Sequence, residues 1–399
     1  MIPRNELRRF EWKVPLRMPK DISEEIRMRQ RRMQSFSKQL GQLGDPVESS
    51  LLSQECLSCV TSLKLLAISC PEGQTEACRT IRACQSLKKL SISKHGNYPD
   101  ICVWEALLGG SRPPLLRLEH LIMSNLPLQG IQDEVNLGTL TALALHRCGG
   151  LSAFLDDWRT RTGTPINLHT FHITLGSQSA PEFRDIPKSV YNFMGSFSGL
   201  VEFALIIRRK DREGIYKVHV WPSEPVMNEL LANHFETLKT IVLDCVPILS
   251  GGLTDSLLYT MYKRCPKLTG LGQQLNLSRT ARLPCSAHGF LDVLSSVSHF
   301  RVCNRVYSYC RLEQATKLAT LSIEHCMRQQ PSRESNLRLV VFDAEAGSGE
   351  AWYYTVETVE DTSGATVPVV ARISEERARE LYGRIGVLNY RQEFAYNDF

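Results

Sequence analysis

Apolar residues recur along the chain in the pattern LxxLxL, whose first, fourth and sixth positions hold leucine or another large apolar residue. The stretch 238–271 shows the pattern most clearly, because Leu238, Ile241 and Leu243 precede a Gly-Gly break and a helical spacing of apolar residues over 253–261. In a β-strand the fourth and sixth positions point to the same side, and the residues between them point to the other. A strand, a turn and a helix within about thirty residues form the unit of a leucine-rich repeat.

Copies of this pattern follow one another through most of the chain. Clear copies are Leu63-Leu66-Ile68, Leu87-Leu90-Ile92, Leu118-Leu121-Met123, Leu140-Leu143-Leu145, Leu168-Phe171-Ile173 and Leu200-Phe203-Leu205, and weaker ones are Leu268-Leu271, Val297-Phe300-Val302, Leu318-Leu321-Ile323 and Leu337-Val340-Phe342. One strand and one helix cannot bury the apolar side alone, so neighbouring units have to stack. We therefore predict an α/β fold, a curved leucine-rich-repeat solenoid with a parallel sheet on its inner face and helices outside.

The chain divides into three predicted parts. Residues 1–50 hold a partial first repeat at Leu7-Phe10-Trp12 and a basic helix over 20–40, residues 51–342 form the solenoid, and residues 343–399 form a C-terminal cap and tail. Within the solenoid, helices are expected at 100–108, 151–158, 187–197, 224–235 and 287–297, and a small hairpin at 206–221. Within the cap we expect an aromatic strand and then a helix over 373–388 that begins at Ser374. The repeat pattern at the very start lacks a capping element, so we expect the chain to be a piece of a longer protein.

Composition narrows the class of protein. The chain is 43% hydrophobic and 22% charged, and no run reaches the roughly eighteen apolar residues of a membrane helix. Because the N-terminus also lacks the apolar core of a signal peptide, we expect a cytoplasmic or nuclear protein with no membrane partner. The thirteen cysteines are spread over a long chain, which favours free thiols. The first forty residues hold eleven Lys and Arg against five Asp and Glu, which suggests either a nucleic-acid patch or a solvated helix face, and we favour the second interpretation.

Motifs for catalysis and metal binding do not stand out. Cys56 and Cys59 form a lone CxxC without the second pair that a zinc site needs. His169 and His172 lie three apart on a predicted strand, so their imidazoles point to opposite faces. The sequence contains no phosphate-binding pattern GxxxxGK[ST]. It also lacks the HExxH motif of zinc proteases and the GxSxG motif of serine hydrolases. We therefore expect no enzyme activity, no cofactor and no metal site.

Three histidines occupy outward strand positions in three consecutive repeats. His120, His146 and His172 should lie on the concave face, at different heights across it, which is more typical of independent surface residues than of a cluster. Small residues surround them, and a surface with little bulk can accept a partner segment closely. The candidate partner-binding residues are His120, Ile122, Ala142, Ala144, His146, Thr170, His172, Thr174, Glu202 and Ala204.

Two segments resemble the cysteine-containing leucine-rich repeats of F-box proteins: GGLTDSLL at 251–258 and RCPKLTGL at 264–271. The stretches 140–148 and 318–326 match the LxxLxLxxC half of that repeat, and Cys148 and Cys326 are expected to turn inward as small apolar residues with a weak donor. The irregular intervals resemble divergent fungal F-box/leucine-rich-repeat-like proteins. The resemblance implies a protein–protein interaction module that recognises a substrate for ubiquitin ligation.

One departure from that family limits the implication. The LPxE-type motif of an F-box does not occur in this sequence. A ubiquitin-ligase adaptor is therefore expected as a partner only if an F-box lies outside the given sequence. The alternative is a free-standing leucine-rich-repeat scaffold, associated with nucleic acid through the basic N-terminal helix, although a nucleic-acid partner is not the expectation we favour. A third hypothesis is an enzyme that uses the concave face.

Overall fold

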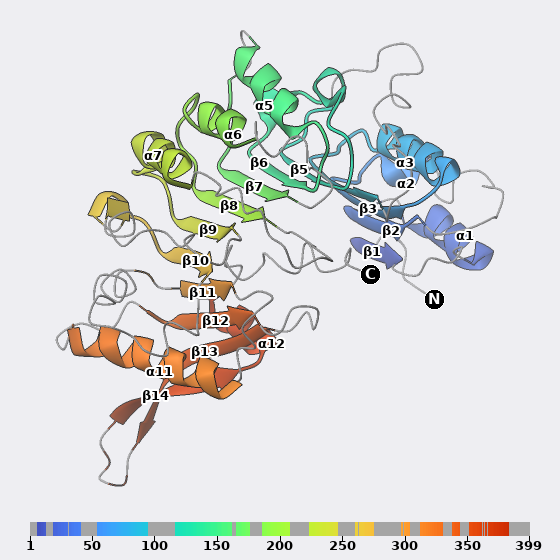
Figure 1. The fold of residues 1–399 in the computed structure, drawn as a ribbon. Helices are drawn as coiled ribbons and strands as arrows, with labels where there is room; N and C mark the ends of the chain where they lie inside the picture. Colours follow the sequence, from blue (N-terminus) through green and yellow to red (C-terminus); the bar gives the residue numbers. More distant parts are fainter. Residues whose placement is uncertain are drawn as a thin grey trace, which may run out of the picture. The chain divides into compact units, whose positions relative to one another are not determined.

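The computed structural model describes residues 6–12, 19–30, 32–40, 54–94, 116–161, 165–175, 186–207, 223–245, 260–261, 263–274, 297, 299–303, 312–329, 337–343, 351–360, 362, 364 and 366–382. The chain divides into two compact units, Met1–Phe197 (unit 1) and Ser198–Phe399 (unit 2). Each unit is an α/β structure in which the strands follow one another in space in their order along the chain (Figure 1).

Unit 1 contains a parallel sheet. Its strands are β1 (Arg9–Trp12), β2 (Ser35–Gln39), β3 (Ser62–Ile68), β4 (Lys89–Lys94), β5 (His120–Ser124), β6 (Ala142–His146) and β7 (Thr170–Leu175), and each pairs in parallel with the next. Its helices are α1 (Lys20–Arg29), α2 (Gln54–Leu57), α3 (Pro71–Ala83), α5 (Leu151–Thr160) and α6 (Ile186–Met194), with short 3-10 turns η1 (Ile131–Asp133) and η2 (Leu137–Thr139) between β5 and β6. Parallel strands need a crossover between them, and these helices and 3-10 turns lie in the described crossovers of unit 1.

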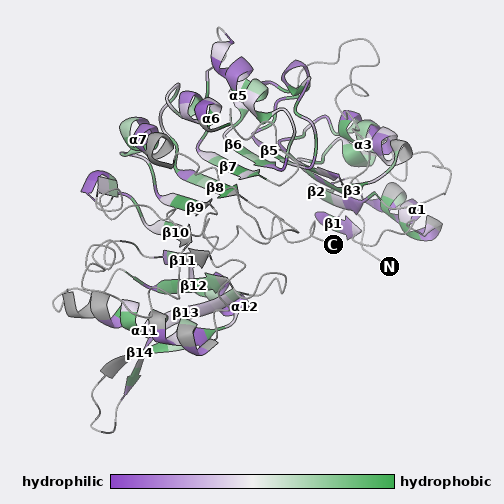
Figure 2. Ribbon diagram, in the orientation of Figure 1, coloured by the Kyte–Doolittle hydropathy of each residue, from purple (hydrophilic) through white to green (hydrophobic). Residues whose placement is uncertain are grey.

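The core of unit 1 lies on the side of the sheet that the LxxLxL residues face. Leu90, Leu121, Leu143 and Phe171 lie in one register across four strands, and each is at most 1% exposed. The ring of Phe193 from α6 lies 5.3 Å from that of Phe171. Helices therefore cover the apolar side of these strands, and Figure 2 shows hydrophobic and hydrophilic residues mixed along α5 and α6, as expected of helices buried on one side.

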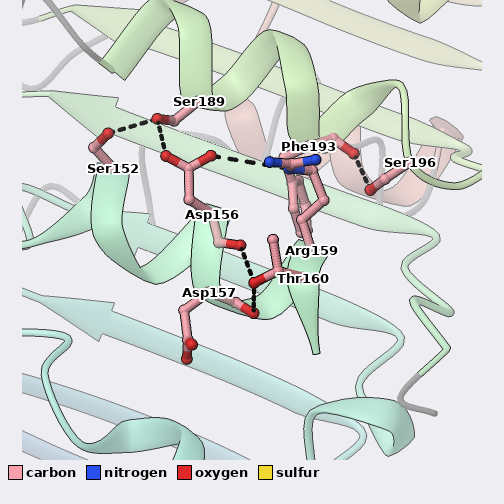
Figure 3. A network of polar contacts seen from close by, with 8 residues as sticks. All are labelled: Ser152, Asp156, Asp157, Arg159, Thr160, Ser189, Phe193 and Ser196. Carbon is pink, nitrogen blue, oxygen red and sulfur yellow. Dashed lines mark hydrogen bonds and ion pairs between the residues drawn. The ribbon is translucent and has the colours of Figure 1, made fainter. Parts of the chain in front are cut away.

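Polar contacts join α5 to α6 beside this apolar contact (Figure 3). The hydroxyl groups of Ser152 and Ser189 share a hydrogen bond, and Ser189 Oγ also donates to Asp156 Oδ2 at 2.8 Å. Asp156 Oδ1 lies 3.9 Å from Arg159 Nε. Buried aromatic rings continue the contact, because Trp158 of α5 lies 5.2 Å from Phe193 between ring centroids. The network contains no imidazole and no thiol, and it serves to fix one helix against the next.

Unit 2 contains a mixed sheet. Its strands are β8 (Glu202–Ile207), β9 (Thr240–Cys245), β10 (Gly270–Gln274), β11 (His299–Cys303), β12 (Leu339–Asp343), β13 (Ala351–Glu360) and β14 (Thr366–Ile373), and its described helices are α7 (Ser223–His234), α11 (Leu312–Gln329) and α12 (Glu375–Tyr382). The strands from β8 to β12 pair in parallel, whereas β12, β13 and β14 pair in antiparallel fashion.

Strand β13, next to the end strand β14, is covered on both faces. Tyr354 shares a hydrogen bond of 3.0 Å with Thr316 of α11, so one face of β13 packs under α11. On the opposite face Tyr353 belongs to a buried apolar cluster that includes Ala378 of α12. Successive residues of a strand point to opposite faces, which places α11 and α12 on the two sides of the same strand.

Most predicted strands are confirmed within the described residues. Every copy of the LxxLxL pattern ends in a strand, with one exception. The strand predicted at Leu318-Leu321-Ile323 was wrong, because these residues lie inside helix α11. The predicted helix over 20–40 was wrong in its second half, since α1 ends at Arg29 and β2 follows.

The other predicted elements divide between confirmed and untested. Helices α5, α6 and α7 confirm those expected at 151–158, 187–197 and 224–235. The strand β13 and the helix α12 confirm the elements expected after 343, and Ser374 Oγ accepts a hydrogen bond from the N–H of Arg377 at 3.1 Å. The predicted helices at 100–108 and 287–297 and the hairpin at 206–221 lie almost wholly outside the described residues.

Candidate functional site

The face of the unit 1 sheet opposite the LxxLxL residues, called here the inner face, carries small and polar side chains in straight rows. The strand registers define three rows across β4 to β7: Lys89, His120, Ala142 and Thr170; Ser91, Ile122, Ala144 and His172; and Ser93, Ser124, His146 and Thr174. Eight of the ten sequence-predicted binding residues therefore lie on one surface, from β5, β6 and β7.

The third row is polar and buried. Ser93, Ser124, His146 and Thr174 are between 2% and 5% exposed. His146 Nδ1 and Thr174 Oγ1 share a hydrogen bond of 2.9 Å, and Ser93 Oγ accepts one from the N–H of Ala67 at 3.1 Å. Hydrogen bonds between neighbouring strands thus keep this end of the inner face rigid, because buried polar groups are stable only when paired.

The three histidines do not form a cluster. His120 lies in the first row on β5, His172 in the second row on β7 and His146 in the third row on β6, so they lie at different heights, as the sequence predicts. Burial lowers the pKa of His172 to about 4, so this ring is neutral near pH 7. Burial and the nearby Lys89 lower the pKa of His120 as well. The half-buried rings of His120 and His172 can therefore offer neutral imidazoles to a partner, whereas His146 is buried.

A backbone feature at the ends of these strands was not visible in the sequence. Asn125 and Arg147, directly after β5 and β6, adopt left-handed backbone conformations with φ of 57° and 52°. The N–H of Asn125 donates to His146 O at 2.8 Å, and its Nδ2 donates to Lys94 O at 3.2 Å. Non-glycine residues rarely adopt positive φ, although Asn does so more readily than most. These turns end the strands at one level and so define the edge of the inner face.

The last two predicted binding residues, Glu202 and Ala204, lie on β8 in unit 2. Ala204 is only 3% exposed and packs in an apolar cluster with Ile206 and Val242. Glu202 is half-buried. Ala204 therefore contributes to the interior of unit 2 and offers no exposed surface.

The cysteines behave as structural residues where the structure describes them. Cys148 is 4% exposed, and its thiol donates to Met123 O at 3.5 Å and to His146 O at 3.6 Å. Burial raises the pKa of this thiol to about 12. The predicted inward position of Cys148 is confirmed, whereas Cys326 follows no strand because it lies in α11. Of the lone CxxC pair, Cys56 is buried and Cys59 is exposed, and the described residues contain no group of metal-binding side chains.

Comparison with known proteins assigns no family. No family model matches the chain. No curated protein matches it either. Among the described residues, no helix is both long and apolar enough to cross a membrane. The surface described above is therefore the main guide to function.

Proposed function

We propose that this chain is a leucine-rich-repeat solenoid that works as a protein-binding module, with the inner face of unit 1 as its binding surface. The observation that supports the proposal most directly is the contrast between the two faces of β4 to β7. One face carries large apolar residues that are buried, and the other carries small, polar and half-exposed ones such as Ala142, Thr170 and Ser91. A stable surface without bulky side chains lets a partner's backbone approach closely.

The repeat interpretation has support in the details of the repeats. The strands of unit 1 are parallel and follow the order of the chain, and a helix or 3-10 turns lie between successive strands wherever the structure describes the connection, which it does not do for most of the stretch between β4 and β5. Cys148, which follows β6, donates to the carbonyl of Met123 in the preceding strand β5 and so links two neighbouring units of the pattern. Repeat proteins present long surfaces of this kind to their partners.

Within the class of binding modules, we propose substrate recognition for ubiquitin ligation, with an adaptor bound through a segment outside this chain. The support for this finer proposal is the resemblance of the segments at 251–258 and 264–271 to F-box repeat proteins. The alternative of a scaffold that binds nucleic acid through α1 is not favoured, because α1 carries three basic and three acidic residues and Arg29 is paired with Glu25 at 3.2 Å. Neutral helices attract phosphate only weakly.

The test is to add bulk to the inner face without disturbing the core. Ala142 is half-buried in the first row between His120 and Thr170, so Ala142→Arg should block close approach of a partner. Ala153 is exposed on α5, and Ala153→Arg is the matched control. Mass spectrometry identifies the proteins that co-purify with the tagged wild-type chain from cells. The amount of these proteins recovered should fall by about tenfold or more with Ala142→Arg and stay unchanged with Ala153→Arg.

Turnover of the bound proteins then tests the finer proposal. A partner that Ala142→Arg no longer binds should become longer-lived in cells that express the variant, and a proteasome inhibitor should remove the difference. Partners lost equally in both variants would contradict the choice of surface. Partners lost only in Ala142→Arg, but with unchanged lifetimes, would support a scaffold and contradict the ligase role.

A further inference from the structure

The hairpin of β13 and β14 extends past the strand beside it. β12 pairs with β13 only over Ala351–Thr355, whereas β13 and β14 pair from Tyr353 to Glu360. The distal part, Val356–Glu360 with Thr366–Val370, is named here the distal ribbon, and Figure 1 shows it extending from the sheet of unit 2. Among the described residues no strand pairs with either edge of the distal ribbon. Two-stranded ribbons with free edges are sites where another strand can add.

The position of Pro368 indicates which edge is usable. Pro368 pairs with Thr358 in a register without shifts, and proline has no N–H to donate to the ladder. Proline within a sheet is therefore tolerated where its nitrogen faces away from the neighbouring strand. The pair Thr358 and Pro368 thus belongs to the residues whose backbone groups point outward. On the β14 edge one donor is missing at Pro368, whereas on the β13 edge Val356, Thr358 and Glu360 all present both N–H and C=O groups.

Side chains of the distal ribbon add apolar surface and negative charge. Val359 is 49% exposed and Val369 is 39% exposed, and both lie on the same face of the ribbon. Glu357 is exposed on that face, and Glu360 is exposed on the opposite face. The two strand segments of the distal ribbon contain two Glu, Glu357 and Glu360, and no Lys or Arg. A segment that adds here therefore meets an acidic surface with exposed valines.

We propose that the β13 edge of the distal ribbon is a second docking site, which receives an extended basic segment of a partner protein as an added strand. Backbone groups of Val356, Thr358 and Glu360 form the ladder to that segment. An apolar residue of the segment packs on Val359, and lysine or arginine at the alternating positions lies on the other face of the ribbon, where it pairs with Glu360. Opposite charge and backbone hydrogen bonding act together, which selects basic extended segments over acidic ones.

A matched pair of proline variants tests the site. Thr358→Pro removes an outward N–H from the β13 edge, and Val370→Pro removes one from the β14 edge, and neither removes a bond between the two strands. The probe is an acetylated nine-residue peptide that alternates threonine or valine with lysine, and an otherwise identical peptide with glutamate for lysine is its control. Affinity is measured by fluorescence anisotropy with the full chain. We expect the basic peptide to bind the wild-type chain and Val370→Pro alike, and Thr358→Pro about tenfold more weakly.

Two further measurements keep the proposal testable if Thr358→Pro is poorly folded. Glu360 has an exposed side chain, and Glu360→Lys should weaken binding of the basic peptide without producing binding of the acidic one. Hydrogen exchange of the wild-type chain should slow at the amides of Thr358 and Glu360 when the basic peptide binds, and stay unchanged at Val370. Equal binding of both peptides, protection at Val370 alone, or no binding of the basic peptide at millimolar concentration would overturn the proposal.

Discussion

A buried ion pair in unit 1 gives a prediction whose size follows from the structure. Lys38 lies in β2 opposite Leu65 of β3, on the side of the sheet that faces the core. Its side chain is 13% exposed and that of Glu76, on α3, is 11% exposed, and Nζ lies 3.8 Å from Glu76 Oε1. Lys38 therefore occupies a position where the repeat pattern places a large apolar residue, and Glu76 is its charged partner.

The attraction between these charges does not exceed the cost of burying them. At 3.8 Å and an effective dielectric constant of about 20, the attraction is about 4 kcal/mol. Removing each ion from water costs several kcal/mol. Burial lowers the pKa of Lys38, and the attraction of Glu76 only opposes that shift in part. The pair as a whole should therefore add little to the free energy of unfolding, whereas either charge left alone should be costly.

Replacement of one or both partners tests this balance. Glu76→Leu leaves a buried lysine without its counter-charge and should lower the free energy of unfolding by about 3–5 kcal/mol, measured by urea denaturation with circular dichroism. Lys38→Met together with Glu76→Leu should recover most of that loss, to within about 1 kcal/mol of the wild type. Glu119→Gln removes an exposed pair with Lys88 and should leave the urea midpoint unchanged. A double variant as unstable as Glu76→Leu alone would refute the reasoning.

Three shorter predictions concern single side chains. Trp158→Ala should lower the free energy of unfolding by about 3–5 kcal/mol in urea denaturation, whereas Trp158→Phe should cost less, because the indole N–H has no hydrogen-bond partner among the described residues. Iodoacetamide at pH 8 should label the exposed Cys59 and spare Cys148, whose pKa is about 12, and mass spectrometry that finds equal labelling would contradict this assignment. His172 binds a proton near pH 4 when folded and near 6.5 when unfolded, so stability should fall as the pH drops from about 6.5 toward 4. Unfolding curves at pH 7 and 5 should show a smaller loss for His172→Asn, and an equal loss in both chains would contradict the shift.

Lys38 also explains why β2 could not be predicted from the sequence. The pattern in that repeat places Met33 and Phe36 in the core and then a lysine at the third position, so the apolar alternation of a strand is interrupted. The charged partner, Glu76, is far along the chain and cannot be recognised from spacing alone. A local pattern indicates a strand only when its buried positions are apolar, and a buried ion pair removes that signal.

The incorrect strand at 318–323 has a different cause. The spacing of Leu318, Leu321 and Ile323 matches the LxxLxL strand pattern, but on a helix residues two apart lie about 200° apart, so Leu321 and Ile323 point to opposite sides of α11. Among the described side chains of α11, Ala315, Ala319 and Ile323, four apart, are buried together with Ser322, whereas Leu321 is 42% exposed. Alanines form much of the buried side of this helix, and a pattern based on leucine does not detect them. The parallel strands with bulky apolar residues were predictable, because each repeats the same alternation.

The inner faces of the two units lead to different conclusions about binding. In unit 1 the inner face carries mostly small or polar residues, half-exposed in its first row and buried in its third. In unit 2 the corresponding face carries Leu339, Val341 and Tyr353, and α12 lies against it with Ala378 fully buried. The hydroxyl of Tyr382 donates to Arg338 O at 3.0 Å, which ties the end of α12 to the sheet.

An apolar face of this kind would attract other proteins without selectivity if it were exposed, and α12 prevents this by covering it. Sequence periodicity did not indicate this role. Within Glu375–Tyr382, Ala378 and Tyr382, four residues apart, face the sheet, and the other residues are charged except the exposed Leu381. Because α12 covers the apolar residues of unit 2, we expect selective contacts with partner proteins at polar surfaces. These are the inner face of unit 1 and the acidic distal ribbon, and for that reason the two proposals place the binding sites there.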